Sequence, residues 1–167
     1  MLNAFGCRIT GYKKHRVDTL PPGYDDMTYD FNEAVESSEI VVNILPLTSE
    51  TENIFNESVL KKMEGKVFVN VGRGGTVDEK ALYQVLKSGV LKGAAIDTWY
   101  VYPKNGETTG FPSRYPIHEL SNVVLSPHAA GFTRQASEEN IKQAFRNLES
   151  FLKTGDVVYR VDLDSGY

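Results

Sequence analysis

Two short segments place chemically active side chains directly after apolar runs. Arg73 lies within residues 71–75 (VGRGG), and His128 lies within residues 126–131 (SPHAAG). A guanidinium binds a carboxylate through two parallel hydrogen bonds, and an imidazole gives and takes a proton near neutral pH. These groups are a carboxylate anchor and a proton donor, the parts that the reduction of a 2-keto acid requires.

The two segments are distant in sequence, so a sheet must bring them together. Runs of apolar and β-branched residues predict strands at 8–12, 40–45, 66–71, 94–96 and 122–125. In open α/β sheets, ligands bind at the carboxyl ends of the strands, where loops from distant parts of the chain converge. Because Arg73 and His128 each follow a predicted strand, both are expected at this edge.

Helices are predicted between the later strands. Capping residues and terminal glycines place them at Asn56–Gly65, at Asp78–Gly89 and from near Thr133 to Gly155, whereas residues 13–39 are predicted to be a loop rich in Pro, Gly and Asp. The last helix carries one apolar stripe, formed by Ile141, Ala144, Phe145, Leu148, Phe151 and Leu152. Alternating strands and helices predict a mostly parallel sheet covered on both faces, a doubly wound α/β fold.

Composition excludes several classes of protein. The chain has 167 residues, 41% of them hydrophobic, which suits one globular domain. A formal net charge of −4 argues against a nucleic-acid partner, and no apolar run is long enough to span a membrane. Cys7 is the only cysteine; we expect it to be a small buried residue in a reducing compartment. With no secretory signal at residues 1–6, the cytoplasm is the expected location.

Five segments together resemble the nucleotide-binding domain of the D-2-hydroxyacid dehydrogenase family. They are residues 45–48 with Thr51, 69–74, 78–82, 93–97 and 122–128, in the order that the family has them. The resemblance covers roughly residues 1–155, which are expected to form an incomplete dinucleotide-binding domain, with residues 156–167 as a C-terminal tail. The implied fold is a Rossmann-like, doubly wound and mostly parallel sheet.

The family's glycine-rich turn is absent from this sequence. Members carry Gly-x-Gly-x-x-Gly between the first strand and the first helix, where backbone N–H groups hold the pyrophosphate. Here residues 1–6 resemble the end of that helix, so the first strand, the glycine-rich loop and the substrate domain are expected to be missing. Since the first strand lies in mid-sheet, its loss would separate strand 8–12 from strand 40–45. We predict that the unpaired edges make the chain rearrange, dimerise or aggregate.

The resemblance implies reversible hydride transfer between NAD(P) and C2 of a small 2-keto or 2-hydroxy acid. Arg73 would anchor the carboxylate, and His128 would transfer the proton. Cofactor contacts are expected from Lys13, Arg16, Pro46, Thr51, Val71, Gly72, Arg73, Asp97, His128, Ala130 and Gly131, with Asp97 beside the nicotinamide carboxamide. No metal site is expected, because neither His15 nor His118 has a second ligand beside it. Family members are commonly homodimers.

The sequence departs from the family at the partner of the histidine. The family usually places Glu in an Asp-Val-Phe-x-x-Glu-Pro stretch, whereas residues 97–103 (DTWYVYP) place Tyr102 there. A neutral hydroxyl does not stabilise an imidazolium as an anion does. Either Glu107 or Glu119 reaches His128 from the enlarged loop, or the site works with a less basic histidine; we hypothesise the second.

Basic residues follow the first predicted strand. Residues 12–16 (YKKHR) lack the acidic residue that accepts hydrogen bonds from the NAD ribose, and they contain three cations. A 2′-phosphate calls for cations, so NADP is favoured, with NAD as the alternative; a solvated basic turn would also explain the pattern.

Two alternatives remain open from the sequence. The aromatic segment 99–120 either forms a wall of the substrate pocket or a partner surface, or packs its own rings on the domain. The chain as a whole is either part of a reductase, inactive alone, or a non-catalytic remnant that serves as a dimerisation or interaction module.

Overall fold

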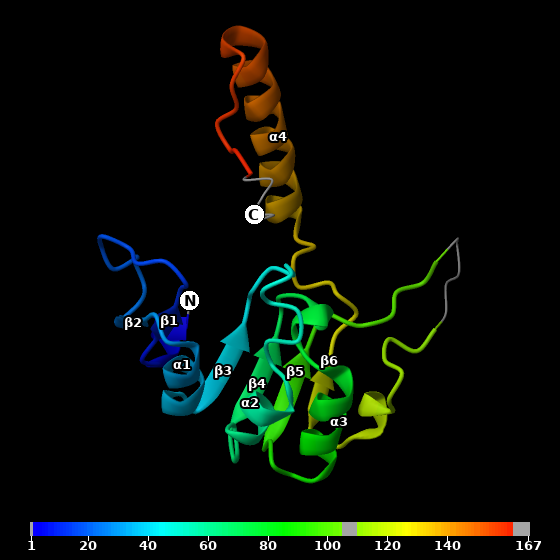
Figure 1. Ribbon diagram of the computed structural model, residues 1–167. Coiled ribbons are helices and arrows are strands. Elements are labelled where there is room, and N and C mark those ends of the chain that lie inside the picture. Colours follow the sequence, from blue (N-terminus) through cyan, green and yellow to red (C-terminus); the bar gives the residue numbers. More distant parts are fainter. Residues whose placement is uncertain (1, 105–109, 162–167) are drawn as a thin grey trace.

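The computed structural model describes residues 2–104 and 110–161, and its main feature is a four-stranded parallel sheet (Figure 1). The strands lie in the order β3 (Ile40–Asn43), β4 (Val67–Asn70), β5 (Gly93–Ile96) and β6 (Val123–Leu125). A separate two-stranded parallel sheet pairs β1 (Thr10–Tyr12) with β2 (Asp26–Thr28). The parallel α/β fold predicted from the sequence is therefore confirmed.

Besides the strands, the described residues form four α-helices and three short 3₁₀ turns. The helices are α1 (Phe31–Ser37), α2 (Glu57–Lys61), α3 (Glu79–Lys87) and α4 (Arg134–Thr154); the 3₁₀ turns are η1 (Leu2–Phe5), η2 (Gly74–Thr76) and η3 (Ile117–Glu119). The predicted caps are confirmed, since Asn56 accepts the N–H of Val59 and Asp78 accepts the N–H of Ala81. These caps satisfy amide donors that have no partner within the helix.

The core lies between α2, α3 and one face of the large sheet (Figure 1). Fully buried side chains from the two helical segments and from the sheet meet there, including Leu60, Met63, Phe68, Leu82 and Leu86. The sequence predicted that helices would cover both faces of the sheet. On the opposite face this prediction was wrong, since Ile40, Val42 and Val124 are exposed there. In residues 97–104 and 110–122, which lead from β5 to β6, the only helical element is the turn η3, so no α-helix of that connection covers this face.

The two sheets are separate in the described residues, as the sequence predicted. In the described part of the chain, β1 pairs with β2 and β3 pairs with β4, but β1 and β3 do not pair with each other. A series of contacting aromatic rings, edge-to-face in the first two pairs and tilted in the third, links the small sheet to the core through Tyr12, Phe31, Phe55 and Phe68, with centroid separations of 5.0–5.5 Å. Side-chain packing thus replaces strand pairing at this junction.

Two local predictions were wrong. Residues 13–39 are not only a loop, because they contain β2 and α1; Asp30 caps α1 by accepting the N–H groups of Asn32 and Glu33. Cys7 is exposed rather than buried, since residues 2–8 have no layer packed over them.

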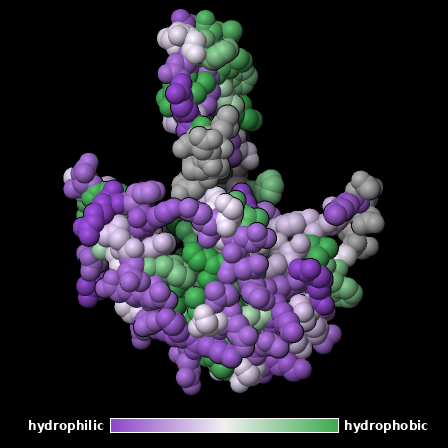
Figure 2. Space-filling view, in the orientation of Figure 1, coloured by the Kyte–Doolittle hydropathy of each residue, from purple (hydrophilic) through white to green (hydrophobic). Residues whose placement is uncertain are grey.

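The helix α4 forms where predicted, but its apolar stripe is not packed. Thr133 caps its start, and Gly155 ends it in the left-handed conformation with φ of 76°. The helix projects away from the sheets (Figure 1), and Figure 2 shows hydrophobic residues along one side of it. No residue of α4 is buried, and Phe145 and Leu152 are 67% and 75% exposed. No described helix is both long and apolar enough to cross a membrane.

Candidate functional site

The loops after β4, β5 and β6 each carry one polar residue of the predicted site. Arg73 follows β4, Asp97 follows β5 and His128 follows β6. Because these strands are parallel and β5 lies between the other two, the three loops share one edge of the sheet. The loop after β5 therefore lies between the arginine and the histidine.

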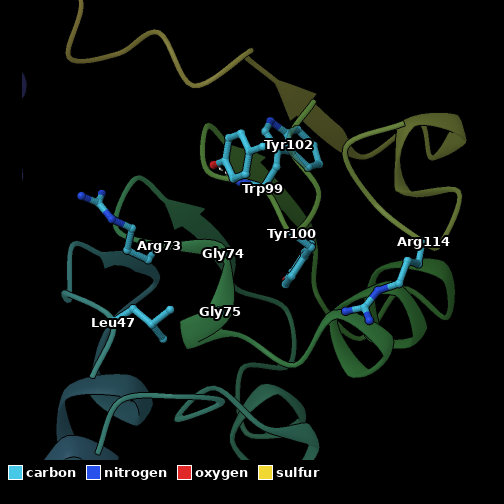
Figure 3. A pocket seen from close by; sticks show the side chains of 8 residues that line it. All are labelled: Leu47, Arg73, Gly74, Gly75, Trp99, Tyr100, Tyr102 and Arg114. Carbon is cyan, nitrogen blue, oxygen red and sulfur yellow. Dashed lines mark hydrogen bonds between the residues drawn. The ribbon is translucent and has the colours of Figure 1, made fainter. Parts of the chain in front are cut away.

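A cavity of about 330 Å³ opens at this edge (Figure 3). It is lined by Leu47, Arg73, Gly74, Gly75, Trp99, Tyr100, Tyr102 and Arg114. Figure 3 shows the rings of Trp99 and Tyr102 above the glycine turn and Leu47 below it, with the guanidinium of Arg73 extending outward at the rim. An exposed cation beside an aromatic-lined cavity can bind an anionic group while the cavity excludes water from the rest of the ligand.

A buried polar network shapes the turn that carries Arg73. The amide of Asn43 donates to Asn70 Oδ1 (2.9 Å) and to Thr76 Oγ1 (2.7 Å). Asn70 Oδ1 also accepts the N–H of Gly72, and Thr76 Oγ1 donates to the carbonyl of Arg73 (2.7 Å). Leaving such buried groups unpaired would cost about 1–3 kcal/mol each. The network therefore fixes the backbone on both sides of Arg73.

The backbone of the same turn packs closely against the loops that follow β3 and β5. A Cβ atom added at Gly72 would lie 2.7 Å from the carbonyl oxygen of Leu45. One added at Gly74 would lie 2.2 Å from the carbonyl oxygen of Trp99. Only glycine allows these approaches, which bring the loops after β3, β4 and β5 together.

Asp97 holds the histidine loop by its carboxylate. It is buried and accepts hydrogen bonds from Ser126 Oγ and from the N–H groups of Ala129 (3.0 Å) and Ala130 (3.1 Å). Burial acts to raise the pKa of Asp97, but these hydrogen bonds and the nearby His128 outweigh it, so the pKa is lowered. The residue expected beside the nicotinamide thus uses both carboxylate oxygens to position the loop.

Trp99 and Tyr102 make further contacts to that loop. The indole Nε1 of Trp99 donates to the carbonyl of Ser126 (2.8 Å). The Oη atom of Tyr102 lies 2.9 Å from Nδ1 of His128 and accepts the backbone N–H of Trp99 (2.9 Å). His128 has a φ of 56°, a strained value for a residue with a side chain. Tyr102 lines the cavity with Arg73, so it connects the predicted anchor to the predicted acid.

Part of the aromatic segment walls the cavity, and part packs elsewhere. Trp99, Tyr100 and Tyr102 are lining residues, whereas Tyr115 stacks on Tyr83 and Phe111 stacks on His118. The two alternatives from the sequence thus apply to different rings of the segment. Burial raises the pKa of Tyr100, with a smaller contribution from the charge of Glu79.

A buried glutamate anchors the far end of this segment. Glu79 accepts hydrogen bonds from Ser113 Oγ, from the backbone N–H of Arg114 and from Arg114 Nε. Arg114 is thereby held at the cavity with its charge balanced. Sequence reasoning missed this contact, since it joins residues 35 positions apart.

The residues predicted on the adenosine side lie across the gap between the sheets. Lys13 and Arg16 are exposed after β1, and Arg16 lies over the ring of Tyr29, 5.1 Å from its centroid. Thr51 donates through Oγ1 to the carbonyl of Pro46 (2.6 Å), which fixes the turn after β3. Glu50, which no sequence pattern had singled out, pairs with Lys14 across this gap. The hydrogen bond and charge of Lys14 lower the pKa of Glu50.

Of the two glutamates considered as partners of His128, only Glu119 lies in the described residues, and it does not pair with His128. Glu119 lies 3.8 Å from Nε2 of His118, and Glu107 lies outside the described residues. Among the described residues, the hydrogen-bond partner of the His128 ring is Tyr102. No group of three or more potential metal-ligating side chains occurs in the part of the chain that the structure describes.

Comparison with known proteins finds reductases and dehydrogenases of small 2-hydroxy acids, both among sequence relatives and among solved structures. A glyoxylate reductase of Thermofilum pendens is 35% identical over 156 residues, which cover 91% of this chain and 43% of the relative. Among solved structures, an NADPH-dependent glyoxylate/hydroxypyruvate reductase from Sinorhizobium meliloti, in complex with NADP and malonate, is 28% identical with a TM-score of 0.75 and covers 99% of this chain and 49% of that one.

A D-isomer specific 2-hydroxyacid dehydrogenase from Lactobacillus delbrueckii, in its NAD-complexed form, is 26% identical with a TM-score of 0.74 and covers 94% of this chain and 50% of that one. The chain thus spans about half the length of the relatives that it matches. The sequence profile described as "D-isomer specific 2-hydroxyacid dehydrogenase, NAD binding domain" matches residues 1–130. With this match and the parallel sheet that positions Arg73 and His128 at one edge, the chain belongs to the D-2-hydroxyacid dehydrogenase family, in the part that forms the NAD-binding domain.

Proposed function

We propose that this chain provides the nucleotide-binding part of an oxidoreductase that transfers a hydride between NAD(P) and C2 of a small 2-keto or 2-hydroxy acid. One observation carries the proposal: Tyr102 lines the same cavity as Arg73 and is hydrogen-bonded to His128. A carboxylate anchor and an acid/base group thus lie at one edge of the sheet. Relatives of this chain are named as glyoxylate and hydroxypyruvate reductases, and the substrates in those names carry a carboxylate beside the carbonyl that is reduced.

Arg73 and His128 have separate roles in this reaction. The exposed fork of Arg73 binds the substrate carboxylate and polarises the neighbouring carbonyl. His128 gives a proton to the carbonyl oxygen as the alcohol forms, and takes it back in the reverse direction. The bound cofactor supplies or accepts the hydride. Residues 1–155 form the nucleotide-binding unit in this proposal, and residues 156–167 form a tail.

The residues present fit a dinucleotide in part. On the nicotinamide side, Val71 to Arg73 and His128 to Gly131 would form the walls, and a Cβ added at Gly131 would meet nothing within 4 Å. On the adenosine side, Pro46 and Thr51 form a fixed turn. The sequence has no Gly-x-Gly-x-x-Gly turn for the pyrophosphate, so the fit covers the two ends of the cofactor.

NADP is the cofactor that we favour. Lys13 and Arg16 are exposed at the end of β1, and no acidic residue is present in the segment 12–16. Two cations without a local carboxylate favour a 2′-phosphate over a free ribose hydroxyl. Glu50 reaches Lys14 from the neighbouring loop and offsets part of this charge. NAD therefore remains the alternative.

The experiment that tests the proposal measures oxidation of NADPH and NADH by the natural polypeptide that contains these residues. Glyoxylate, hydroxypyruvate and pyruvate are offered as substrates, and D- and L-hydroxy acids are used in the reverse direction. Turnover of a 2-keto acid, lost in Arg73→Ala and in His128→Ala, supports the assignment. Turnover that persists in both variants contradicts it.

A second candidate is a non-catalytic module that associates with copies of itself. This candidate agrees with the homodimer and the cytoplasmic location expected from the sequence. The unpaired edges of β1 and β3 and the exposed stripe of α4 favour it. Titration of this chain with NADPH, followed by cofactor fluorescence, separates the two candidates. Saturable micromolar binding supports the reductase, whereas self-association without binding supports the module.

A further inference from the structure

The phenol oxygen of Tyr102 lies between a backbone donor and the imidazole of His128. Its Oη atom is 2.9 Å from the N atom of Trp99 and 2.9 Å from Nδ1 of His128. The backbone N–H can only donate, so Oη accepts that hydrogen bond and keeps its own hydrogen for another acceptor. Nδ1 of His128 is in place to receive it. The neutral ring then carries its proton on Nε2.

The same contact survives when the ring becomes charged. Both nitrogens of an imidazolium are donors, so Nδ1–H then donates to the second lone pair of Oη. The hydroxyl hydrogen then turns away from Nδ1, and Tyr102 as a residue is 43% exposed, so water is available near the ring. When Nε2 then gives its proton to a substrate, the ring is left as the Nδ1–H tautomer, still bonded to Oη, and it returns to the resting Nε2–H form by proton exchange with water. Rotation of one hydroxyl therefore keeps the ring held in each protonation state.

We propose that Tyr102 is a positioning residue, which orients the His128 ring through Nδ1 in its neutral and its charged state without favouring the charged state as a carboxylate would. The part of this inference that concerns catalysis rests on the proposed function. The part that concerns the orientation of the ring does not, since it follows from the two contacts of Oη.

The surrounding structure makes this contact specific. The histidine loop is already fixed by Asp97 and by the indole of Trp99, which come from the same segment as Tyr102. These contacts hold the backbone of the loop, whereas Tyr102 contacts the His128 ring itself. Removing the hydroxyl should free the ring and leave the loop in place.

Nitrogen NMR of the imidazole tests the orientation without any need for turnover. The chain is labelled with ¹⁵N-histidine, and His15 and His118 are replaced by Gln so that one ring is observed. We expect the neutral ring of His128 to carry its proton on Nε2. In Tyr102→Glu the carboxylate accepts from Nδ1–H, so the proton is expected on Nδ1, and the ring should titrate about one pH unit higher. The same tautomer in both proteins would overturn the proposal.

Kinetics of the natural polypeptide test the consequence for catalysis. Tyr102→Phe is expected to lower kcat about tenfold, with the KM for the keto acid and the midpoint of the pH profile unchanged. Tyr102→Glu should restore most of the kcat that Tyr102→Phe loses and move the alkaline limb upward by about one pH unit. Tyr115→Phe, which changes a tyrosine of the same segment that stacks on Tyr83, should change neither.

The outcomes separate this proposal from the proposed function. If no 2-keto acid is turned over, the proposed function fails, and the tautomer exchange between the wild-type chain and Tyr102→Glu still decides the role of Tyr102. If turnover is present but Tyr102→Phe is as fast as the wild-type enzyme, Tyr102 does not position the ring, and the proposal is overturned.

Discussion

The backbone N–H of Ala129 lies 3.0 Å from a carboxylate oxygen of Asp97, so the end of β5 fixes the loop that carries His128. The adjacent N–H of Ala130 bonds to the other oxygen of the same carboxylate. Two parallel strands are thus joined beyond the point where their own pairing ends. This relationship makes Asp97 a stability determinant and leads to a pH dependence.

Asp97→Asn should destabilise the fold. Asparagine offers one acceptor oxygen, so at least one donor of the loop loses its partner, at a cost of about 1–3 kcal/mol. Because the folded pKa of Asp97 is lowered, its contribution is complete above the ordinary aspartate value of about 3.9 and is lost as pH falls through the folded pKa. Urea unfolding at several pH values checks this. Exposed Asp18→Asn is the control, and a difference that grows toward acid pH would contradict the assignment.

Gly74→Ala should be poorly tolerated. The added methyl group would lie 2.2 Å from the carbonyl oxygen of Trp99, a backbone atom that cannot move without shifting the loop after β5. Overpacking of this kind costs about 1–3 kcal/mol. Thermal unfolding compared with Gly110→Ala, where an added Cβ meets nothing within 4 Å, isolates the effect. Equal melting temperatures for the two variants would show that the close approach is absent in solution.

Arg73→Lys should keep the positive charge and lose the fork. The natural polypeptide carrying this change is expected to show a kcat/KM for the keto acid lower by about 10–100-fold, with a larger loss in Arg73→Ala. Steady-state kinetics at saturating NADPH measure this. Arg134→Ala removes an exposed arginine that pairs only locally with Glu138 and should leave the rate unchanged. Full activity in Arg73→Lys would argue against bidentate binding of the carboxylate.

Arg16→Ala should weaken binding of NADPH about tenfold and leave binding of NADH unchanged, because its charge would face only the 2′-phosphate. Fluorescence titration with both cofactors gives the two dissociation constants. Arg8→Ala serves as the control, because it removes a cation just before β1 whose Nη2 atom lies 3.6 Å from Asp26 Oδ2. Equal affinity of the wild-type protein for NADPH and NADH would end the argument for NADP.

The chain should self-associate in solution. Unpaired edges at β1 and β3 and the exposed stripe of α4 present apolar surface to a second copy. Light scattering over a range of protein concentrations is expected to show dimers or larger species. Phe145→Lys combined with Leu148→Lys should reduce the association if α4 mediates it. Monodisperse monomer with a sharp thermal transition would contradict this prediction.

Local signals in the sequence were sufficient for much of the fold. Asn56 and Asp78 mark the starts of α2 and α3 because a capping side chain must sit next to the amides it satisfies. The apolar runs before Arg73 and His128 likewise mark the strands β4 and β6, and the polar and glycine residues that follow each run mark where the strand ends. The segment from Asp30 to Glu33 carried a comparable capping signal for α1, but the short strand β2 and the many turn-forming residues around it obscured the element.

Contacts between distant residues could not be predicted in the same way. The network of Asn43, Asn70 and Thr76 requires knowledge of the β3–β4 register, in which Asn43 lies beside Asn70. The contact between Tyr102 and His128 depends on the conformations of the loops that follow β5 and β6. The apolar stripe of α4 gave the helix correctly, but helical periodicity does not state what covers it.

The isolation of α4 has a practical value. With no buried residue, its 21 residues rely on the Thr133 cap, the Gly155 terminus, the two hydrogen bonds between Asn147 and Tyr159 and surface ion pairs such as Glu149–Lys153. Most helices in proteins are instead stabilised chiefly by the packing of an apolar face. Its amides should therefore exchange with deuterium far sooner than those of the β-sheet core. Any molecule that covers the apolar stripe would slow that exchange, so the exchange rate of the α4 amides reports whether a partner is bound to this helix.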